Sequence, residues 1–155
     1  MSQPASDFTP ALGPRGSIKL YDHLIALLTR EKTWRSELLV ALTLQEALTI
    51  VDIGAGTASM AIAIKSTQPA AHVIAIDPDP DIRIIAEAKA KKAGTEVEFI
   101  TAMGDTKLDD TILPGTVDRV LISLVLHQCP LTMKMSILAN AFRFLKPGGR
   151  LLIAD

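Results

Sequence analysis

The sequence predicts an α/β protein with a doubly wound, mostly parallel sheet that helices cover on both faces. From about residue 47, short apolar runs rich in β-branched residues alternate with amphipathic stretches of helical spacing. The first apolar run ends in a glycine turn, VDIGAGTAS at residues 51–59, which opens directly into a helical pattern. Proline or glycine marks most boundaries between segments. Strands and helices that alternate at this spacing are typical of parallel sheets.

The first 46 residues precede this alternating region. Residues 1–17 are rich in proline and glycine and predict a flexible arm. Two short amphipathic helices are expected next, because leucines and one tryptophan recur at helical spacing (Leu20, Leu24, Leu27 and Leu28, then Trp34, Leu38, Leu39 and Leu42). We therefore expect a single domain over residues 18–155, with a helical lead-in at 18–46 and a β/α core at 47–155.

Five buried strands are expected in the core, each a short run of apolar and β-branched residues. They are Leu48–Ile53, His72–Asp77, Glu96–Thr101, Val117–Ser123 and Arg150–Ala154. Right-handed crossovers between them would align the ends that carry Gly54, Asp77 and Ser123 along one edge of the sheet.

Three helices are expected between these strands. One covers Ala58–Lys65, and a second begins at Asp79-Pro80, a good N-cap followed by proline at the first helical position. Gly94 stands where that helix should end. The third carries a stripe of apolar residues and is stopped by Pro147-Gly148-Gly149; the stripe is Leu131, Met135, Leu138, Phe142 and Leu145.

Composition excludes several classes of protein. With 48% hydrophobic and 21% charged residues, the 155-residue chain can bury a core. A net charge of −1, no basic block and 4% aromatic residues argue against a nucleic-acid partner. The single cysteine, Cys129, provides neither a disulfide framework nor a cysteine metal cluster. No signal peptide and no apolar run of ~18 residues is present, so we expect no membrane span and a cytoplasmic protein.

Five motifs give the chain a family resemblance: VDIGAGTAS, AIDPDP, AMGDTKLDD, VDRVLISLVLHQ and LKPGGRLLIAD. Their order and spacing resemble those of class I S-adenosylmethionine-dependent methyltransferases, most closely the quinone-biosynthesis-type small-molecule group. The lead-in YDHLIALLTREKTWR also resembles the N-terminal helices of that group, so the resemblance covers roughly residues 18–155. The glycine motif alone would be weak, because dehydrogenases share it. The resemblance implies a Rossmann-like core and S-adenosylmethionine as the methyl donor.

The first motif predicts the cofactor turn. Gly54 and Gly56, with Ala55 between them, allow a sharp turn and the close approach of a ligand. The resemblance places Asp52 beside that turn, where an acidic group orients the cofactor's ammonium, often through water. The chain departs from the family at Ala58, where glycine is usual; a small methyl group on a helix should leave binding intact or somewhat weakened.

The next two motifs supply residues for the nucleoside half. Asp77 lies 77 − 54 = 23 residues after Gly54, which agrees with an acidic residue ~20 positions on that accepts from ribose hydroxyls. The alternative is that Asp77 merely helps to begin the next helix. By resemblance, Pro78 lies against the adenine, and Gly104, Asp105 and Thr106 form the loop whose carboxylate accepts from the adenine amino group. Asp105 could instead be an ordinary loop aspartate.

The fourth motif provides the acceptor side. In similar enzymes the segment with Ser123 and Leu124 lies under the methionine part of the cofactor and faces the acceptor. His127 is the candidate catalytic base there, with an ordinary pKa of about 6.5; the alternative is a histidine that only packs. Tyr21 resembles a pocket tyrosine of the N-terminal helices. His72 and His23 are expected to be structural or solvated, and Trp34 is expected in the core.

The sequence therefore predicts in-line methyl transfer to a small, apolar or aromatic acceptor, with S-adenosylhomocysteine as product and no metal. Two alternatives stay open: a module that binds the cofactor without turnover, and a nicotinamide-dependent oxidoreductase. The oxidoreductase is disfavoured because Ser59 stands where its glycine motif needs glycine. Similar enzymes continue after the fifth strand with a helix and a β-hairpin, whereas this sequence stops at Asp155. We therefore expect strand five to be an open edge. Three explanations stay open: a truncated chain, a natural fragment, or a homodimer that covers the edge.

Overall fold

The computed structural model describes residues 31–45 and 47–155. The expected arm, the first lead-in helix, Tyr21 and His23 lie outside the described residues. The described chain begins with α2 (Glu31–Ala41), which matches the second expected lead-in helix. Its Leu38 and the following Leu42 are buried, and Trp34 packs against the same core, as expected for a structural residue.

The sheet has five parallel strands in the order β3-β2-β1-β4-β5. The strands are β1 (Thr49–Ile53), β2 (His72–Asp77), β3 (Glu98–Thr101), β4 (Val117–Ser123) and β5 (Leu145–Ala154). This order confirms the doubly wound prediction. The chain moves outward from β1 to β3 and then returns to place β4 on the other side of β1, so the order reverses between β1 and β4.

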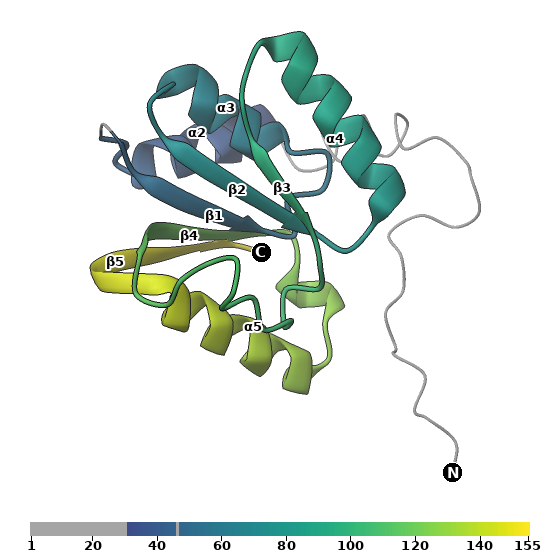
Figure 1. Cartoon of the computed structure of the whole chain (residues 1–155), viewed down its shortest axis with the longest axis vertical. Helices are drawn as coiled ribbons and strands as arrows, with labels where there is room; N and C mark the ends of the chain where they lie inside the picture. Colours follow the sequence, from purple (N-terminus) through teal and green to yellow (C-terminus); the bar gives the residue numbers. More distant parts are fainter. Residues whose placement is uncertain (1–30, 46) are drawn as a thin grey trace.

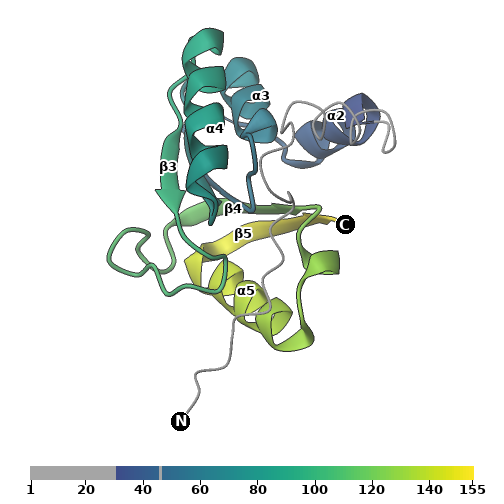
Figure 2. The same cartoon turned by 90° about the vertical axis from the view of Figure 1, so that its right-hand side faces the viewer.

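Helices cover both faces of this sheet (Figures 1 and 2). On one face lie α2, α3 (Ser59–Thr67) and α4 (Pro80–Ala93), and on the other lies α5 (Leu131–Phe144). The side chains of β1 alternate between two cores: Ile50 packs in the cluster with α3, and Val51 and Ile53 pack in the cluster with α5. Because helices cover both faces of the sheet, the strands have nearly continuous apolar sequences and do not alternate between apolar and polar residues.

Helix α4 forms as its sequence predicts. The Asp79 carboxylate accepts hydrogen bonds from the backbone N–H groups of Asp81 (2.8 Å) and Ile82 (3.3 Å), and Pro80 follows as the first helical residue. Gly94 ends the helix at φ +66°, in the left-handed region that glycine adopts without steric cost. The N-cap, the proline and the C-terminal glycine thus determine where α4 begins and ends.

Two predictions about the last helix and strand are wrong in detail. The Pro147-Gly148-Gly149 segment lies inside β5, which begins directly after α5 at Leu145 and has a register irregularity opposite β4 between Val117 and Arg119. Only part of the expected apolar stripe of α5 packs: Leu138 and Leu145 lie against the core, and the other three members do not. Leu131, Met135 and Phe142 are 73%, 62% and 81% exposed, whereas Ile137, Ala141 and Phe144 are buried. Helix α5 carries two apolar faces, and its amphipathic pattern alone does not identify the one that packs.

Candidate functional site

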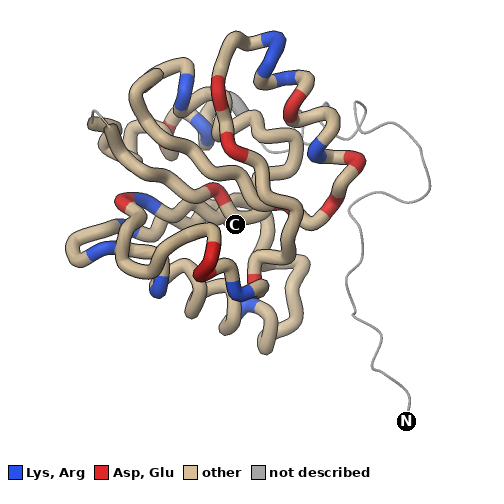
Figure 3. The backbone as a smooth tube through the Cα atoms, viewed as in Figure 1, with Lys and Arg blue, Asp and Glu red and all other residues tan. Residues whose placement is uncertain are grey.

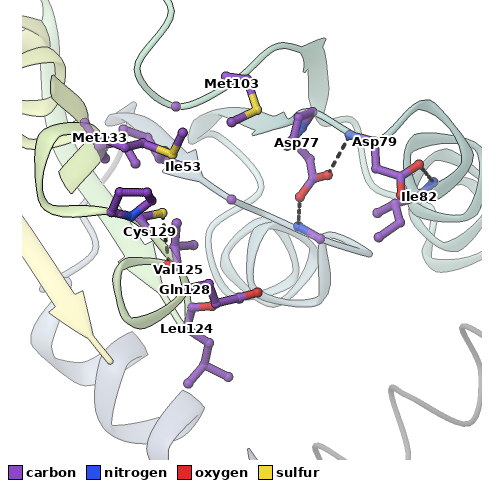
Figure 4. Close-up of a pocket in the computed structure, with 16 residues that line it drawn as sticks. Ile53, Asp77, Asp79, Ile82, Met103, Leu124, Val125, Gln128, Cys129 and Met133 are labelled. Carbon is purple, nitrogen blue, oxygen red and sulfur yellow. Dashed lines mark hydrogen bonds between the residues drawn. The ribbon is translucent and has the colours of Figure 1, made fainter. Parts of the chain in front are cut away.

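A pocket opens at the carboxyl edge of the sheet, where the strand order reverses (Figure 4). Its walls come from the segments that follow β1, β2, β3 and β4, and from the start of α5. Open α/β sheets bind ligands at this position because neighbouring loops diverge there. The lining residues are Ile53, Gly54, Gly56, Asp77, Pro78, Asp79, Ile82, Met103, Gly104, Leu124, Val125, Gln128, Cys129, Pro130, Met133 and Ile137.

The turn after β1 needs glycine at Gly54 for two reasons. Its φ is +74°, and a Cβ atom there would lie 2.2 Å from Cγ2 of Val125, in the segment after β4. The backbone N–H groups of Gly54 and Ala55 both donate to the carbonyl of Ile76, at 2.8 and 3.0 Å. The turn is therefore held against β2 on one side and against the β4 segment on the other.

Ala58 differs from the expectation that it lies on a helix. It is the N-cap of α3, fully buried, with φ +57° in the left-handed region. An L-residue pays roughly 1–2 kcal/mol for this conformation, which explains physically why glycine is favoured there. The neighbouring Gly56, at φ +55°, lines the pocket, and no atom of the described residues lies within 4 Å of the Cβ position on it.

Asp77 joins the end of β2 to the glycine turn (Figure 4). One carboxylate oxygen accepts from the backbone N–H of Gly56 at 2.9 Å, and the other accepts from that of Asp79 at 3.0 Å. Burial raises the pKa of Asp77, while these two hydrogen bonds oppose the increase. Because Asp79 caps α4, the helix does not require Asp77 as its cap. Each oxygen keeps acceptor capacity for a further donor in the pocket.

Asp52 is a fully buried carboxyl group in the middle of the sheet. Neither of its oxygens has a hydrogen-bond partner among the described residues. Burial raises its pKa to about 7, the charge of Arg35 lowers it, and the charge of Asp77 raises it. Asp52 does not line the pocket, so the structure separates it from the wall that Gly54 and Asp77 share. A buried carboxylate without donors is costly, and a nearby cation would reduce that cost.

The segment after β4 enters the pocket in a strained conformation. Leu124 has φ +55°, which is uncommon for a residue with a branched side chain. Its backbone N–H donates to the carbonyl of Ala154 at 2.8 Å, and its carbonyl accepts from Nε2 of Gln128 at 2.9 Å. Strain that a surrounding network holds in place is frequent at functional sites. Burial raises the pKa of the Cys129 thiol, which lies in the same wall.

His127 lies in a short 3-10 turn, Leu126–Gln128, at the same edge of the sheet. Its Nδ1 is 2.9 Å from Oδ1 of Asp155, the residue after β5. The imidazole is 55% exposed and does not line the pocket, so it lies outside the wall formed by its neighbours. A carboxylate on Nδ1 orients an imidazole and leaves Nε2 free to accept a proton.

The structure thus brings together only part of the predicted site. Gly54, Gly56, Asp77, Pro78, Gly104 and Leu124 line one pocket. Asp52, Ala55, Asp105, Thr106, Ser123 and His127 do not line it. Sequence reasoning missed most of the apolar wall, namely Ile53, Ile82, Met103, Val125, Met133 and Ile137. Met103 could have been found from its place next to Gly104, whereas Met133 and Ile137 carry no signal that separates them from ordinary core residues.

Within residues 31–45 and 47–155, no group of three or more His, Cys, Asp and Glu side chains could hold a metal ion. No helix in the same part of the chain is long and apolar enough to cross a membrane. Basic and acidic residues are interspersed along the described backbone (Figure 3).

Comparisons with known proteins agree with this geometry. Residues 50–149 match the family model described as "Methyltransferase domain". A demethylmenaquinone methyltransferase from Thermus thermophilus is 33% identical over 141 residues, which are 87% of this chain and 60% of that relative. A phenazine O-methyltransferase from Lysobacter antibioticus is 32% identical over 107 residues, which are 69% of this chain and 30% of that protein. This chain spans about 60% or less of the length of these relatives.

Solved structures show the same architecture. A precorrin-6y C5,15-methyltransferase from Geobacter metallireducens superimposes with a TM-score of 0.65 at 30% identity, over 77% of this chain and 60% of that one. A geranyl diphosphate methyltransferase gives a TM-score of 0.71 at 21% identity, over 85% of this chain and 48% of that one. The second likeness, at low identity, concerns the fold alone.

Proposed function

Because the chain belongs to the methyltransferase domain family, we propose that it is an S-adenosylmethionine-dependent methyltransferase acting on a small, apolar or aromatic acceptor. The observation that carries the proposal is the position of Asp77. Its carboxylate lies at the end of β2, lines the pocket and is bonded to the glycine turn. In this fold an acidic group at that position accepts from the ribose of an adenosine-type cofactor.

The residues present fit that cofactor. Asp77 would hold the ribose, and the apolar side chains of Ile82 and Met103 would flank the adenine beside Pro78 and Gly104. The methionine part would lie along Gly54 and Gly56. Asp52 is buried without a hydrogen-bond donor among the described residues, which supports a place for the cofactor's ammonium nearby. Because Asp52 does not line the pocket, a water molecule would connect its carboxylate to that ammonium. When bound, the cofactor supplies a methyl group on sulfur that is open to in-line displacement.

The acceptor side would be the wall after β4. Leu124, Val125, Cys129 and Met133 give that wall an apolar surface, which suits an apolar or aromatic molecule. Relatives named for demethylmenaquinone and phenazine support a small-molecule acceptor. The chain's own chemical task would be alignment, because orienting two reactants removes much of the barrier to a displacement.

His127 is proposed as the base that takes a proton from a hydroxyl acceptor. Its Nδ1 contact with Asp155 supports this role, since the carboxylate would fix the tautomer that leaves Nε2 as the acceptor. The imidazole lies outside the pocket wall, so the acceptor would have to extend beyond Leu124 towards the 3-10 turn. An acceptor that is already nucleophilic would not need this histidine.

We also propose that a second copy of the chain covers the open edge of β5. Among the described strands β5 pairs only with β4, and Ile153 on it is 47% exposed. The exposed stripe of α5, with Leu131, Met135 and Phe142, lies on the adjacent layer. A two-fold axis would pair two β5 edges and bring the two stripes together. Sedimentation of the chain and of Ile153→Lys tests this. A dimer that the lysine dissociates supports the proposal if Ile84→Lys, on the exposed face of α4 away from β5, leaves it intact.

The first test of function is a calorimetric titration of the chain with S-adenosylmethionine and S-adenosylhomocysteine, with NAD as the control. Micromolar binding of the adenosyl ligands without binding of NAD supports the proposal. Methylated product from a small phenolic or quinol acceptor would then separate an enzyme from a module that binds the cofactor without turnover. A folded chain that binds neither adenosyl ligand would contradict the proposed function.

A further inference from the structure

We propose that Asn140 of α5 is a positioning residue that holds the loop after β3 in place and thereby sets the affinity for the adenosine half of the cofactor. The proposal rests on the function proposed above. It extends the site farther along α5, the helix on the opposite face of the sheet from α3 and α4, beyond the Met133 and Ile137 that line the pocket (Figure 2).

Asn140 is an unexpected residue at its position. It lies in the second half of α5, faces the core and is only 6% exposed. Asparagine is a poor helix former, and a buried amide is costly unless it is hydrogen-bonded. Its side-chain nitrogen donates to two backbone carbonyls, those of Gly104 and Thr106, both at 3.0 Å. The two hydrogen bonds that compensate its burial therefore both go to the loop after β3.

Arg143 and Asp109 fix the orientation of this amide. Oδ1 of Asn140 accepts from Nη2 of Arg143 at 3.0 Å, and the same guanidinium nitrogen is 2.8 Å from Oδ1 of Asp109. A guanidinium can only donate, so the amide oxygen must point to Arg143 and the amide nitrogen to the loop. Asp109 lies farther along the same loop, which α5 thus holds at two points.

Gly104 of this loop is also packed closely against its neighbours. A Cβ atom on Gly104 would lie 2.6 Å from Cγ2 of Ile53 and 3.3 Å from Cγ1 of Ile137. Gly104 is packed against these side chains on one side while Asn140 holds its carbonyl. The remaining surface of Gly104 lines the pocket next to Met103. Figure 4 shows Met103 on the same side of the pocket as Asp77, away from Leu124 and Gln128. We therefore expect Asn140 to help fix the position of the pocket wall formed by Met103 and Gly104.

The deciding variant is Asn140→Asp. Aspartate keeps the size and an acceptor for Arg143 but loses both donated hydrogen bonds and places a carboxylate beside two carbonyls. We expect its affinity for S-adenosylhomocysteine and for adenosine to fall by the same factor, about tenfold, because the loss lies in the half that the two ligands share. Met135→Asp, at an exposed position of the same helix two turns from Arg143, is the control that adds the same charge without touching the loop contact. Dissociation constants of Asn140→Asp within twofold of the wild type for both ligands would overturn the proposal.

Hydrogen exchange of the loop provides a readout that needs no cofactor. The backbone N–H of Thr106 donates to the carbonyl of Met103 at 3.0 Å, and we expect Asn140→Asp to speed its exchange while Met135→Asp does not. If the wild type binds no adenosyl ligand, the proposed function fails, and this exchange still tests the loop contact. If Asn140→Asp does not fold, Asn140→Ala decides, because it removes both donated hydrogen bonds without adding a charge. Faster exchange in residues 103–109 supports the contact, and unchanged exchange overturns it.

Discussion

The carboxylate of Asp77 accepts a hydrogen bond from the backbone N–H of Gly56 over 2.9 Å, and this bond joins two loops that are 21 positions apart. The second oxygen of Asp77 holds the N–H of Asp79, just before α4. One side chain thus sets the distance between the glycine turn and the start of α4. The residue that would bind the ribose also shapes the pocket that receives it.

Replacing Asp77 by asparagine should damage both roles. The amide nitrogen cannot accept from a backbone N–H, so one of the two bonds is lost and the free energy of unfolding should fall by about 1 kcal/mol. Affinity for S-adenosylhomocysteine should fall at least about tenfold, as measured by calorimetry. Asp81→Asn, in the exposed first turn of α4, is the matched control and should change binding little. Equal affinities of Asp77→Asn and wild type would remove Asp77 from the ribose site.

Asp52 should make stability depend on pH in an unusual direction. Its pKa is about 7 in the folded chain and 3.8 ordinarily, so between these values the folded state binds more protons than the unfolded state. The free energy of unfolding should therefore decrease as the pH rises from about 4 to 7, by an amount on the order of a few kcal/mol, and then level off. Denaturant unfolding of wild type and Asp52→Asn across this range measures it. A wild-type profile as flat as that of the variant would show that Asp52 does not titrate there.

Binding of the cofactor should be linked to the same proton. If an ammonium approaches Asp52, the ionised carboxylate is favoured, and binding near pH 6 to 7 should release a proton from the protein. Calorimetric titrations with S-adenosylhomocysteine in buffers of different ionisation enthalpy detect this release. In Asp52→Asn the measured binding enthalpy should depend less strongly on the ionisation enthalpy of the buffer. Binding without any dependence on the buffer would argue that Asp52 lies too far from the ammonium to respond.

Gly54 should be the most sensitive glycine of the turn. Alanine there meets both a left-handed backbone and Cγ2 of Val125, so Gly54→Ala should cost about 2–4 kcal/mol of unfolding free energy. Gly148→Ala is the control: its φ is +80° with no atom of the described residues within 4 Å of the Cβ position, and it should cost only about 1 kcal/mol. Val125→Ala in the Gly54→Ala background should recover part of the loss. Similar costs for the two glycines would mean that the contact with Val125 relaxes easily.

His127 should affect turnover and leave cofactor binding intact. With a phenolic acceptor, His127→Gln should lower kcat about 10²-fold or more, because the proton acceptor is lost, while the affinity for S-adenosylhomocysteine stays the same. Asp155→Asn should give a smaller loss, since an amide beside Nδ1 holds the imidazole less firmly than the carboxylate does. His72→Gln is the control, as this exposed histidine pairs with Glu98 away from the pocket. Full activity of His127→Gln would show that the acceptor reacts without this base.

The sequence by itself determined the features that neighbouring residues decide. Apolar runs located the strands, and Asp79, Pro80 and Gly94 set the ends of α4 with the caps that their own backbones require. The same holds for the glycine turn at Gly54 and for the spacing to Asp77, which is fixed once strand, turn and helix are placed. In these cases the physical signal lies within one element or between consecutive ones.

Only the tertiary structure decided which side chains meet across the fold. Asn140 reaches Gly104 over 36 positions, and Nδ1 of His127 reaches Asp155 over 28. Neither pairing leaves a local pattern, because each depends on where α5 and β5 pack. The predictions for Ala58 and for the packed face of α5 were wrong for the same reason. The left-handed conformation of Ala58 and the burial of each face of α5 depend on residues that are distant in the sequence and that packing brings close. A periodic pattern states that a helix has an apolar face, and packing against the sheet decides which face that is.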